Sequence, residues 1–336
     1  MKDTLEPNHL RLRHYTETTP VWLRRFTKFV AASTLFLIFA GAMVTSTGSG
    51  LAVPDWPTTY GENMFTFPLS KWVGGIFYEH GHRLIASMVG FLTIIQALWL
   101  QRREPKRYVR VLGWIALAAV IVQGLLGGLT VIFLLPTAIS VAHAGLAEIF
   151  FCLNVSIAFF TSRFFHQLRA MPRGDTPVTG TTALLGITYA QILVGALMRH
   201  LGAGLAIPDF PLAFGRIIPE FASTGIIVNY AHRVGAATVT VAILILAARL
   251  LRFERNHPLR LLATLLLLVI PAQILLGGYT VWSGKQPVIT SLHVVVGAST
   301  LALTLVLMLS ARTIAWRSEK ENAGRTITLA TPEATA

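Results

Sequence analysis

Residues 48–61 read GSGLAVPDWPTTYG, and residues 202–215 read GAGLAIPDFPLAFG. Eight of these fourteen positions are identical at an offset of 154 residues. Further matches follow at an offset of 150: QGLLGGLTV at 123–131 recurs as QILLGGYTV at 273–281, His82-Arg83 recurs as His232-Arg233, and His143 recurs as His293. Such self-similarity predicts that the chain is two copies of one structural unit, and that the second copy is four residues shorter in its first outer loop.

The composition shows what kind of unit is repeated. The chain has 336 residues, of which 54% are hydrophobic and 13% charged, and its mean hydropathy is +0.62. These values exclude a soluble globular protein, a disordered chain and a fibrous repeat. A helix needs about 20 apolar residues to cross a bilayer. The runs long enough are 27–46, 76–100, 111–134, 138–162, 181–202, 226–248, 260–282 and 288–311.

We therefore predict an all-α integral membrane protein with eight transmembrane helices. Because each repeat has an even number of spans, both copies insert the same way up. The prediction is two fused four-helix bundles related by a pseudo-twofold axis along the membrane normal. The expected segments are an N-terminal segment 1–26, a first half 27–162, a linker 163–180, a second half 181–311 and a tail 312–336.

The basic residues predict the orientation. Most of the 28 Lys and Arg residues lie in the two terminal segments and in the connections after the second, fourth and sixth spans. These parts should therefore face the cytoplasm of a bacterial inner membrane. The net charge of +13 is then a topology signal that contacts anionic membrane lipids, and nucleic-acid binding is not expected.

Four histidines form the most informative pattern within the spans. His82 and His143 are 61 residues apart, and so are His232 and His293. They fall on the second, fourth, sixth and eighth spans, each roughly 8–9 Å below the outer surface at about 1.5 Å per residue. Two histidines at equal depth on two helices of one bundle can hold a metal centre between them.

The remaining residues narrow the choice of metal. Cys152 is the only cysteine, which excludes a disulfide within the chain, a thiolate zinc cluster and an iron–sulfur cluster. A di-iron carboxylate site needs Glu-x-x-His on two helices, but Asn229 stands where the first half has Glu79. Two axial histidines per bundle fit haem, whose porphyrin supplies the other four ligands. Small residues that could give the porphyrin room are Gly127, Gly128, Gly145, Gly277, Gly278 and Gly297.

Charged residues beside the histidines are further candidates. Arg83 and Arg233 could pair with haem propionates, or could be interfacial arginines that reach toward water. Glu79 lies one helical turn before His82 and exists in one half only, which suggests that the halves have different roles; alternatively, it pairs with Arg83. The duplicated Pro-Asp-aromatic-Pro loops could act as lids over the two sites or as structural turns.

Three other polar residues are left without a committed role. Glu148 is expected to have a local hydrogen-bonded partner rather than a place in a proton relay. No role is predicted for His80 or His200.

Together these residues resemble the heme A synthase family, from about Trp22 to Arg317. The matching elements are the two Gly-x-Gly-Leu-Ala-x-Pro-Asp-(Trp/Phe)-Pro loops, Glu79-x-x-His82-Arg83, His143, His232-Arg233 and His293. The resemblance implies oxidation of the C8 methyl group of haem O to a formyl group by successive hydroxylations, which gives haem A. It also implies that His232 and His293 ligate a haem B cofactor, that His82 and His143 hold the substrate haem, and that Glu79 acts beside it as the catalytic carboxylate.

The resemblance also implies partners, and it has one departure. A haem O synthase would supply the substrate and an electron acceptor would remove electrons; a homo-oligomer is left open. Some members carry a cysteine pair in the first outer loop, whereas this loop has none, so the chain resembles the cysteine-free branch. The alternatives are a two-haem b-type electron-transfer protein without haem modification, and a transporter built on a parallel repeat.

Overall fold

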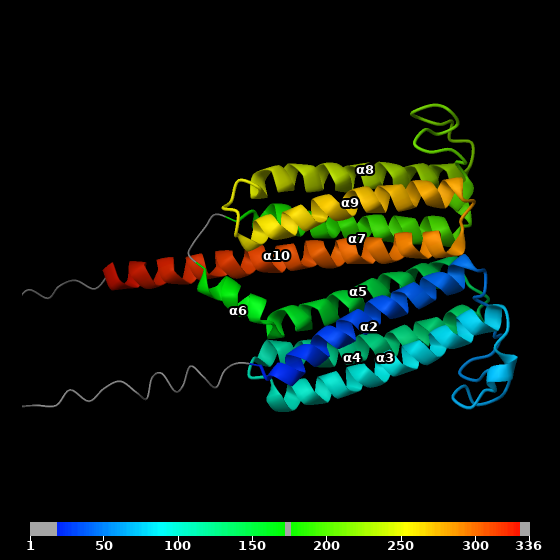
Figure 1. Cartoon of the computed structure of the whole chain (residues 1–336), viewed down its shortest axis with the longest axis horizontal. Helices are drawn as coiled ribbons and strands as arrows, with labels where there is room; N and C mark the ends of the chain where they lie inside the picture. Colours follow the sequence, from blue (N-terminus) through cyan, green and yellow to red (C-terminus); the bar gives the residue numbers. More distant parts are fainter. Residues whose placement is uncertain (1–18, 172–175, 330–336) are drawn as a thin grey trace, which may run out of the picture.

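The computed structural model describes residues 19–171 and 176–329, with side chains up to residue 315. Within this part of the chain, eight helices are long and apolar enough to cross a membrane (Figure 1). They are α2 (Val21–Ser46), α3 (Gly75–Arg103), α4 (Arg107–Ile132), α5 (Thr137–Thr161), α7 (Val178–His200), α8 (Thr224–Leu250), α9 (Pro258–Trp282) and α10 (Pro287–Leu329). The protein is an integral membrane protein of eight transmembrane helices, as predicted.

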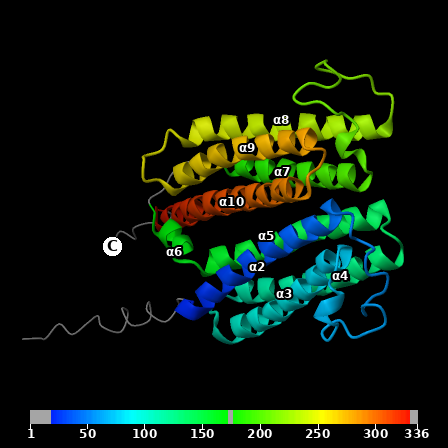
Figure 2. The same ribbon diagram turned by 45° about the vertical axis from the view of Figure 1, so that its right-hand side comes forward.

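The helices form two four-helix bundles that lie side by side, α2–α5 and α7–α10 (Figures 1 and 2). The packing is repeated: α2 contacts α3 and α5 as α7 contacts α8 and α10, and α4 contacts α3 and α5 as α9 contacts α8 and α10. Between the bundles, α2 packs on α10, α7 packs on α5, and α5 meets α10. Exchanging the bundles reproduces this set of contacts, which is the predicted pseudo-twofold arrangement.

Local sequence explains where several helices begin and end. Proline is the residue before α2, α5 and α7 and the first residue of α9 and α10, because the start of a helix does not need its missing N–H. At the opposite ends of α2 and α7, Gly48 and Gly202 each have a φ of 68°. This left-handed conformation is favourable for glycine and stops the helix.

The two long connections, residues 47–74 and 201–223, lie at the same end of the molecule, which we call the loop end. They contain short 3₁₀ turns, η1 (Leu69–Lys71) and η2 (Ala203–Leu205). The opposite end, which we call the terminal end, contains the start of α2, the short helix α6 (Arg163–Ala170) and the last turns of α10.

The helices differ from those expected most clearly at three places. α2 begins six residues before position 27, α10 continues to Leu329 rather than ending near 311, and α6 occupies part of the expected linker 163–180. Hydropathy marks where a span leaves the apolar layer, but backbone hydrogen bonds can continue the helix through polar residues. α2 and α10 therefore extend beyond the ends of their apolar runs.

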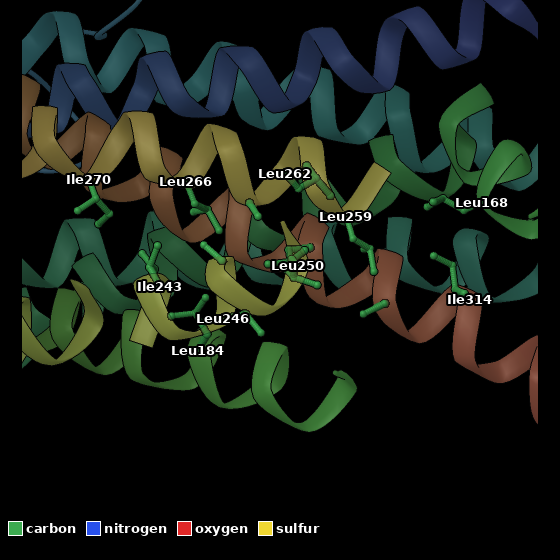
Figure 3. Packing of buried hydrophobic residues seen from close by; sticks show 14 of the residues in the cluster. Leu168, Leu184, Ile243, Leu246, Leu250, Leu259, Leu262, Leu266, Ile270 and Ile314 are labelled. Carbon is green, nitrogen blue, oxygen red and sulfur yellow. The ribbon is translucent and has the colours of Figure 1, made fainter. Parts of the chain in front are cut away.

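The apolar cores occupy the part of each bundle away from the loop end. In the second bundle, leucine and isoleucine side chains of α7, α8 and α9 pack together with Leu168 of α6 and Ile314 of α10 (Figure 3). The first bundle has a smaller core that includes Leu23, Leu100 and Phe150. This packing closes the bundles at the terminal end, so that the polar residues of interest gather at the loop end.

Candidate functional site

The four repeated histidines lie near the loop end, one on each of α3, α5, α8 and α10. They are the eighth residue of α3, the seventh of α5, the ninth of α8 and the seventh of α10. At about 1.5 Å per residue, all four are on the order of 10 Å inside their helix starts. Their side chains are partly buried. The two-bundle fold thus places one histidine pair in each bundle, at matching depth.

Each histidine ring packs against a glycine of the preceding helix. A methyl group added to Gly41 would lie 3.0 Å from Cε1 of His82, and one added to Gly195 would lie 2.8 Å from Cε1 of His232. Gly127 and Gly277 are related in the same way to His143 and His293, with distances of 3.1 Å for both. A larger residue at any of these four positions would push on the ring. The glycines therefore form a cradle for each histidine.

Two of these four glycines were missed from the sequence. Gly127 and Gly277 belong to the repeated diglycine motif, whereas Gly41 and Gly195 stand outside any quoted motif. They are nevertheless related by the offset of 154 residues that relates the two loops. Extending that offset back into the helices would have found them.

The second-half pair has a spacing that fits a metal between the rings. The ring centroids of His232 and His293 are 6.4 Å apart, and the rings are inclined by 78°. A metal–imidazole bond is about 2.0–2.1 Å long, so two histidines with this ring spacing could hold one metal between them.

The hydrogen bonds of the rings fit metal ligation too. Nδ1 of His293 lies 3.1 Å from the backbone oxygen of Gln273, and this bond forms when Nδ1 carries the proton and Nε2 keeps its lone pair. Nδ1 of His82 and Nδ1 of His143 are buried without a hydrogen-bond partner. The site thus contains ring nitrogens that the protein itself does not satisfy. These donors and the glycine cradles suit a flat iron porphyrin with two axial histidines.

Glu79 is buried at the start of α3, with 4% of its surface exposed. Its Oε1 is 2.7 Å from Nη2 of Arg83, and its Oε2 accepts a hydrogen bond of 2.7 Å from the backbone N–H of Val53. Arg83 also donates to three backbone oxygens of the first loop, those of Val53, Asp55 and Thr58. Four of its five N–H groups are therefore used within the protein, and the Glu79–Arg83 pair considered from the sequence is present.

The second half has the same frame without the carboxylate. Asn229 is buried, donates to the backbone oxygens of Ala203 and Gly204, and accepts a hydrogen bond of 3.0 Å from Nε of Arg233. Arg233 also donates to the backbone oxygens of Leu212 and Ile207. Both arginines thus anchor the loop of their own half. The difference between the halves at this position is one negative charge.

The duplicated loops fold alike. Asp55 accepts hydrogen bonds from the N–H groups of Tyr60 and Gly61 and from the hydroxyl of Thr58. Burial raises the pKa of the Asp55 carboxyl, but these hydrogen bonds outweigh burial and hold its pKa below the usual 3.8. Asp209 repeats the arrangement with Gly215 and Phe214, whose N–H groups lower its pKa as well.

An aromatic side chain from each loop covers the end of a helix. A methyl group added to Gly128 would lie 2.5 Å from the ring of Trp56, and one added to Gly278 would lie 2.9 Å from the ring of Phe210. In α4, the His143 ring therefore packs against Gly127 and the Trp56 ring packs against Gly128. The corresponding rings pack in the same way against the diglycine of α9. Each loop is docked directly beside a histidine cradle.

Each half has a glutamine that contacts one of its histidines, but from different helices. In the first half, Nε2 of Gln123 on α4 lies 2.9 Å from the backbone oxygen of His143 and 3.3 Å from its Nε2. In the second half, Nε2 of Gln191 on α7 lies 2.7 Å from the backbone oxygen of His232 and 3.0 Å from its Nδ1. Gly235 makes room for this side chain, because a methyl group there would lie 2.0 Å from Oε1 of Gln191. The corresponding residue of the first half is Leu37. This asymmetry was not noticed in the sequence, although the offset of 154 residues exposes it.

The other polar residues singled out from the sequence lie outside the two pairs. His80 is fully buried beneath the first loop, where its Nδ1 lies 3.0 Å from Oγ1 of Thr59 and its ring contacts Phe67 and Trp72. Glu148 is 4% exposed on α5, and its Oε2 has no hydrogen-bond partner. His200 is the last residue of α7.

Comparisons with known proteins show the family to which the chain belongs. A family model described as "Cytochrome oxidase assembly protein" matches residues 24–306. A heme A synthase of Shouchella clausii is 30% identical over 258 residues, which cover 75% of this chain and 84% of that protein. Heme A synthases of Alkalihalophilus pseudofirmus and Halalkalibacterium halodurans are each 29% identical; the matches cover 80% and 82% of this chain, and 86% and 92% of the relatives.

The family model covers most of the two bundles, including all four histidines, both loops and Glu79. The relatives do not favour the alternative of an electron-transfer protein that leaves haem unmodified. The single cysteine, Cys152, lies within α5 and not in a loop, which fits the cysteine-free branch. The chain belongs to the heme A synthase family.

Proposed function

We propose that this protein is an oxidoreductase that converts the C8 methyl group of haem O into a formyl group and so produces haem A. One observation carries the proposal. Two bundles of the same fold each place a histidine pair in glycine cradles at the loop end, and only one of them has a buried carboxylate one turn from its histidine. A carboxylate in only one of two similar haem sites is expected if that site binds the substrate haem and the other site holds a haem cofactor.

The second half is the cofactor site in this proposal. His232 and His293 hold a haem B, which supplies a one-electron redox couple when bound. Two observations support this assignment: the 6.4 Å between the ring centroids and the bond from Nδ1 of His293 to the Gln273 carbonyl. Groups that orient the outer nitrogen of a ligating histidine strengthen metal binding by about 10–100-fold. A retained cofactor benefits from such bonds.

The first half is the substrate site, where His82 and His143 hold haem O. Their buried Nδ1 atoms have no hydrogen-bond partners among the described residues, and Gln123 contacts His143 only at Nε2 and the backbone oxygen. No described residue therefore orients these rings through Nδ1 as Gln273 does for His293. Weaker orientation suits a haem that must enter as substrate and leave as product. Glu79 lies on the same helix face as His82, one turn away, at the side of this haem.

Glu79 serves the reaction as a fixed negative charge and a proton acceptor. With water as the source of oxygen, conversion of the methyl group to the formyl group releases four electrons and four protons. A buried carboxylate beside the substrate stabilises positive charge that develops there and can accept a proton as each C–H bond breaks. Val53 N–H and Arg83 hold its two oxygens in place. Arg83 and Arg233 keep the loops closed over the two sites.

The proposed setting follows from the basic residues. Both termini face the cytoplasm, so the loop end and both haem sites lie toward the outer face of a bacterial inner membrane. A haem O synthase in the same membrane supplies the substrate. An electron acceptor, which the chain itself does not identify, removes the four electrons.

Co-expression with a haem O synthase tests the function. Chromatography of the extracted haems should show haem A in cells that make the wild-type protein. Glu79→Ala should reduce haem A by about 100-fold or more, because a positioned acid–base group contributes about 10²–10⁴-fold. Glu62→Gln, a change of an exposed carboxylate in the same half, is the control. Haem A formation that survives Glu79→Ala would show that the catalytic assignment is wrong.

A further inference from the structure

We propose that Arg199 binds a propionate carboxylate of the second-half haem and places its positive charge beside that haem. This inference rests on the proposed function, because it requires a haem between His232 and His293. Arg199 is in the last turn of α7, at the loop end, where the two bundles meet.

The first observation is that this partly buried guanidinium has no carboxylate partner. None of the ion pairs among the described residues involves Arg199. Its Nη2 donates to the backbone oxygen of Ala42 at 2.6 Å and to the hydroxyl of Ser46 at 2.7 Å, both on α2 of the other bundle. These contacts use one of its three nitrogens. A charge removed from water without a counterion is costly, so a site of this kind favours an anion.

The second observation is the position of Arg199 among the histidines. Gly195, which cradles His232, is one turn earlier on the same helix. Ser46 also contacts Ser291, with 3.0 Å between their hydroxyl oxygens, and Ser291 is two residues before His293 on α10. Arg199 therefore lies beside both ligands of the second-half haem, nearer the loop end.

The third observation concerns the arginines that the sequence favoured for propionates. Four of the five N–H groups of Arg83 are bound within the protein, and Arg233 is bound to Asn229 and to two loop oxygens. Only Nη2 of Arg199 makes hydrogen bonds among the described residues, so its Nε and Nη1 remain for a ligand. A guanidinium binds a carboxylate through two parallel hydrogen bonds.

The charge gives a measurable consequence. The first half has Thr45 at the position of Arg199, so the charge is present once and not twice. A positive charge beside haem favours the reduced iron, because the oxidised haem is more positive by one unit. Removing Arg199 also leaves the propionate charge without its partner, and both effects act in the same direction.

The test uses the purified protein from a host without haem O synthase, so that haem B is the haem available. In Arg199→Gln, the ratio of oxidised to reduced haem at a fixed potential should rise at least tenfold, which corresponds to a midpoint lower by about 59 mV for a one-electron couple. The resonance Raman band of propionate bending should also shift. Arg216→Gln, which removes an exposed arginine of the second loop, should change neither. A ratio within threefold of wild type in Arg199→Gln would overturn the proposal.

Arg199→Lys keeps the charge but loses the two-pronged bond. It should keep the ratio within threefold of wild type while shifting the propionate band. An unchanged band in this variant would overturn the propionate contact, even if Arg199→Gln did not fold. A wild-type protein that holds no haem would instead contradict the proposed function, so the two failures are distinguishable.

Discussion

The two halves share a fold but differ in the groups that surround their histidines. In the first half, Glu79 is a buried carboxylate, and Nδ1 of His82 and Nδ1 of His143 have no hydrogen-bond partner within the described part of the chain. In the second half, Asn229 takes the place of the carboxylate, and both histidines have contacts at Nδ1. The comparison teaches that a duplicated bundle can become a reaction site or a retaining site through a few polar substitutions.

The interiors of the two bundles also differ, because the first contains a buried polar cluster where the second is more apolar. Gln96 donates to Oδ1 of Asn154 at 2.8 Å, and Asn154 also donates to Thr34, which gives the first half a buried polar cluster. At the positions corresponding to Gln96 and Asn154, the second half has Leu246 and Thr304. Leu246 belongs to the larger apolar core of that half (Figure 3). The half proposed to retain its haem therefore has the larger apolar core.

The largest expected effect comes from removing one histidine of each half. In a host without haem O synthase, His293→Ala should lower the haem that remains after purification by about tenfold or more, since losing a ligand costs at least as much as losing a group that orients it. His143→Ala should retain that haem, yet should form no haem A when haem O is supplied. Haem content measured from the Soret absorbance checks both. Equal losses in the two variants would contradict the division between the halves.

A smaller effect is expected from filling one glycine cradle. Gly195→Ala would place a methyl group 2.8 Å from Cε1 of His232, so the ring must move away from its position. Overpacking of this kind costs about 1–3 kcal/mol, and we expect about a tenfold weaker retention of haem. Gly186→Ala on the same helix is the matched control, because no atom lies within 4 Å of the added methyl group. Equal haem retention in the two variants would argue against the cradle.

Substitutions of the buried amide pair Gln96 and Asn154 should have non-additive effects on the free energy of unfolding. Gln96→Leu leaves Asn154 without its partner and should lower the free energy of unfolding by about 1–3 kcal/mol. Changing both residues to leucine should cost less than the sum of the two single changes, because no unpaired polar group remains. Thermal unfolding of the purified variants measures this. Additive losses would show that the pair is not coupled.

The smallest effect concerns the loops and pH. Hydrogen bonds hold the pKa of Asp55 and of Asp209 below the usual 3.8, so the folded loops bind protons less readily than the unfolded chain. The stabilisation is present above pH 3.8 and is lost as the pH falls through the lowered pKa values. Hydrogen exchange at residues 55–61 and 209–215, measured relative to the intrinsic rate of the unfolded chain at each pH, should therefore accelerate only in acid. Asp55→Asn should accelerate it in the first loop alone at neutral pH; acceleration in both loops would contradict independent folding of the halves.

Much of this architecture could be predicted without coordinates. The apolar runs, the offsets of 154 and 150 residues and the 61-residue spacing placed four histidines at one depth in two bundles. Periodicity and spacing are local quantities, and a helix translates them directly into depth and face. Glu79 could be singled out because its counterpart is Asn229.

Other features depended on which helices meet. The contact of Arg199 with Ala42 joins residues 157 positions apart in two bundles, and no repeat relates them. The occupation of Arg83 by loop oxygens likewise depends on how residues 53–58 fold back over α3. Backbone carbonyls carry no sequence signature, so their part in binding an arginine cannot be read from residue types.

The sequence by itself determined the spans, the duplication, the histidine pairs and the one-sided carboxylate, because each follows from residue type and distance along a helix. Only the tertiary structure decided which arginines are already bound, which glycines cradle a ring, and that one guanidinium between the bundles has no counterion among the residues that the structure describes. Those properties depend on neighbours brought together by packing, where a difference of about 1 Å separates a contact from a clash.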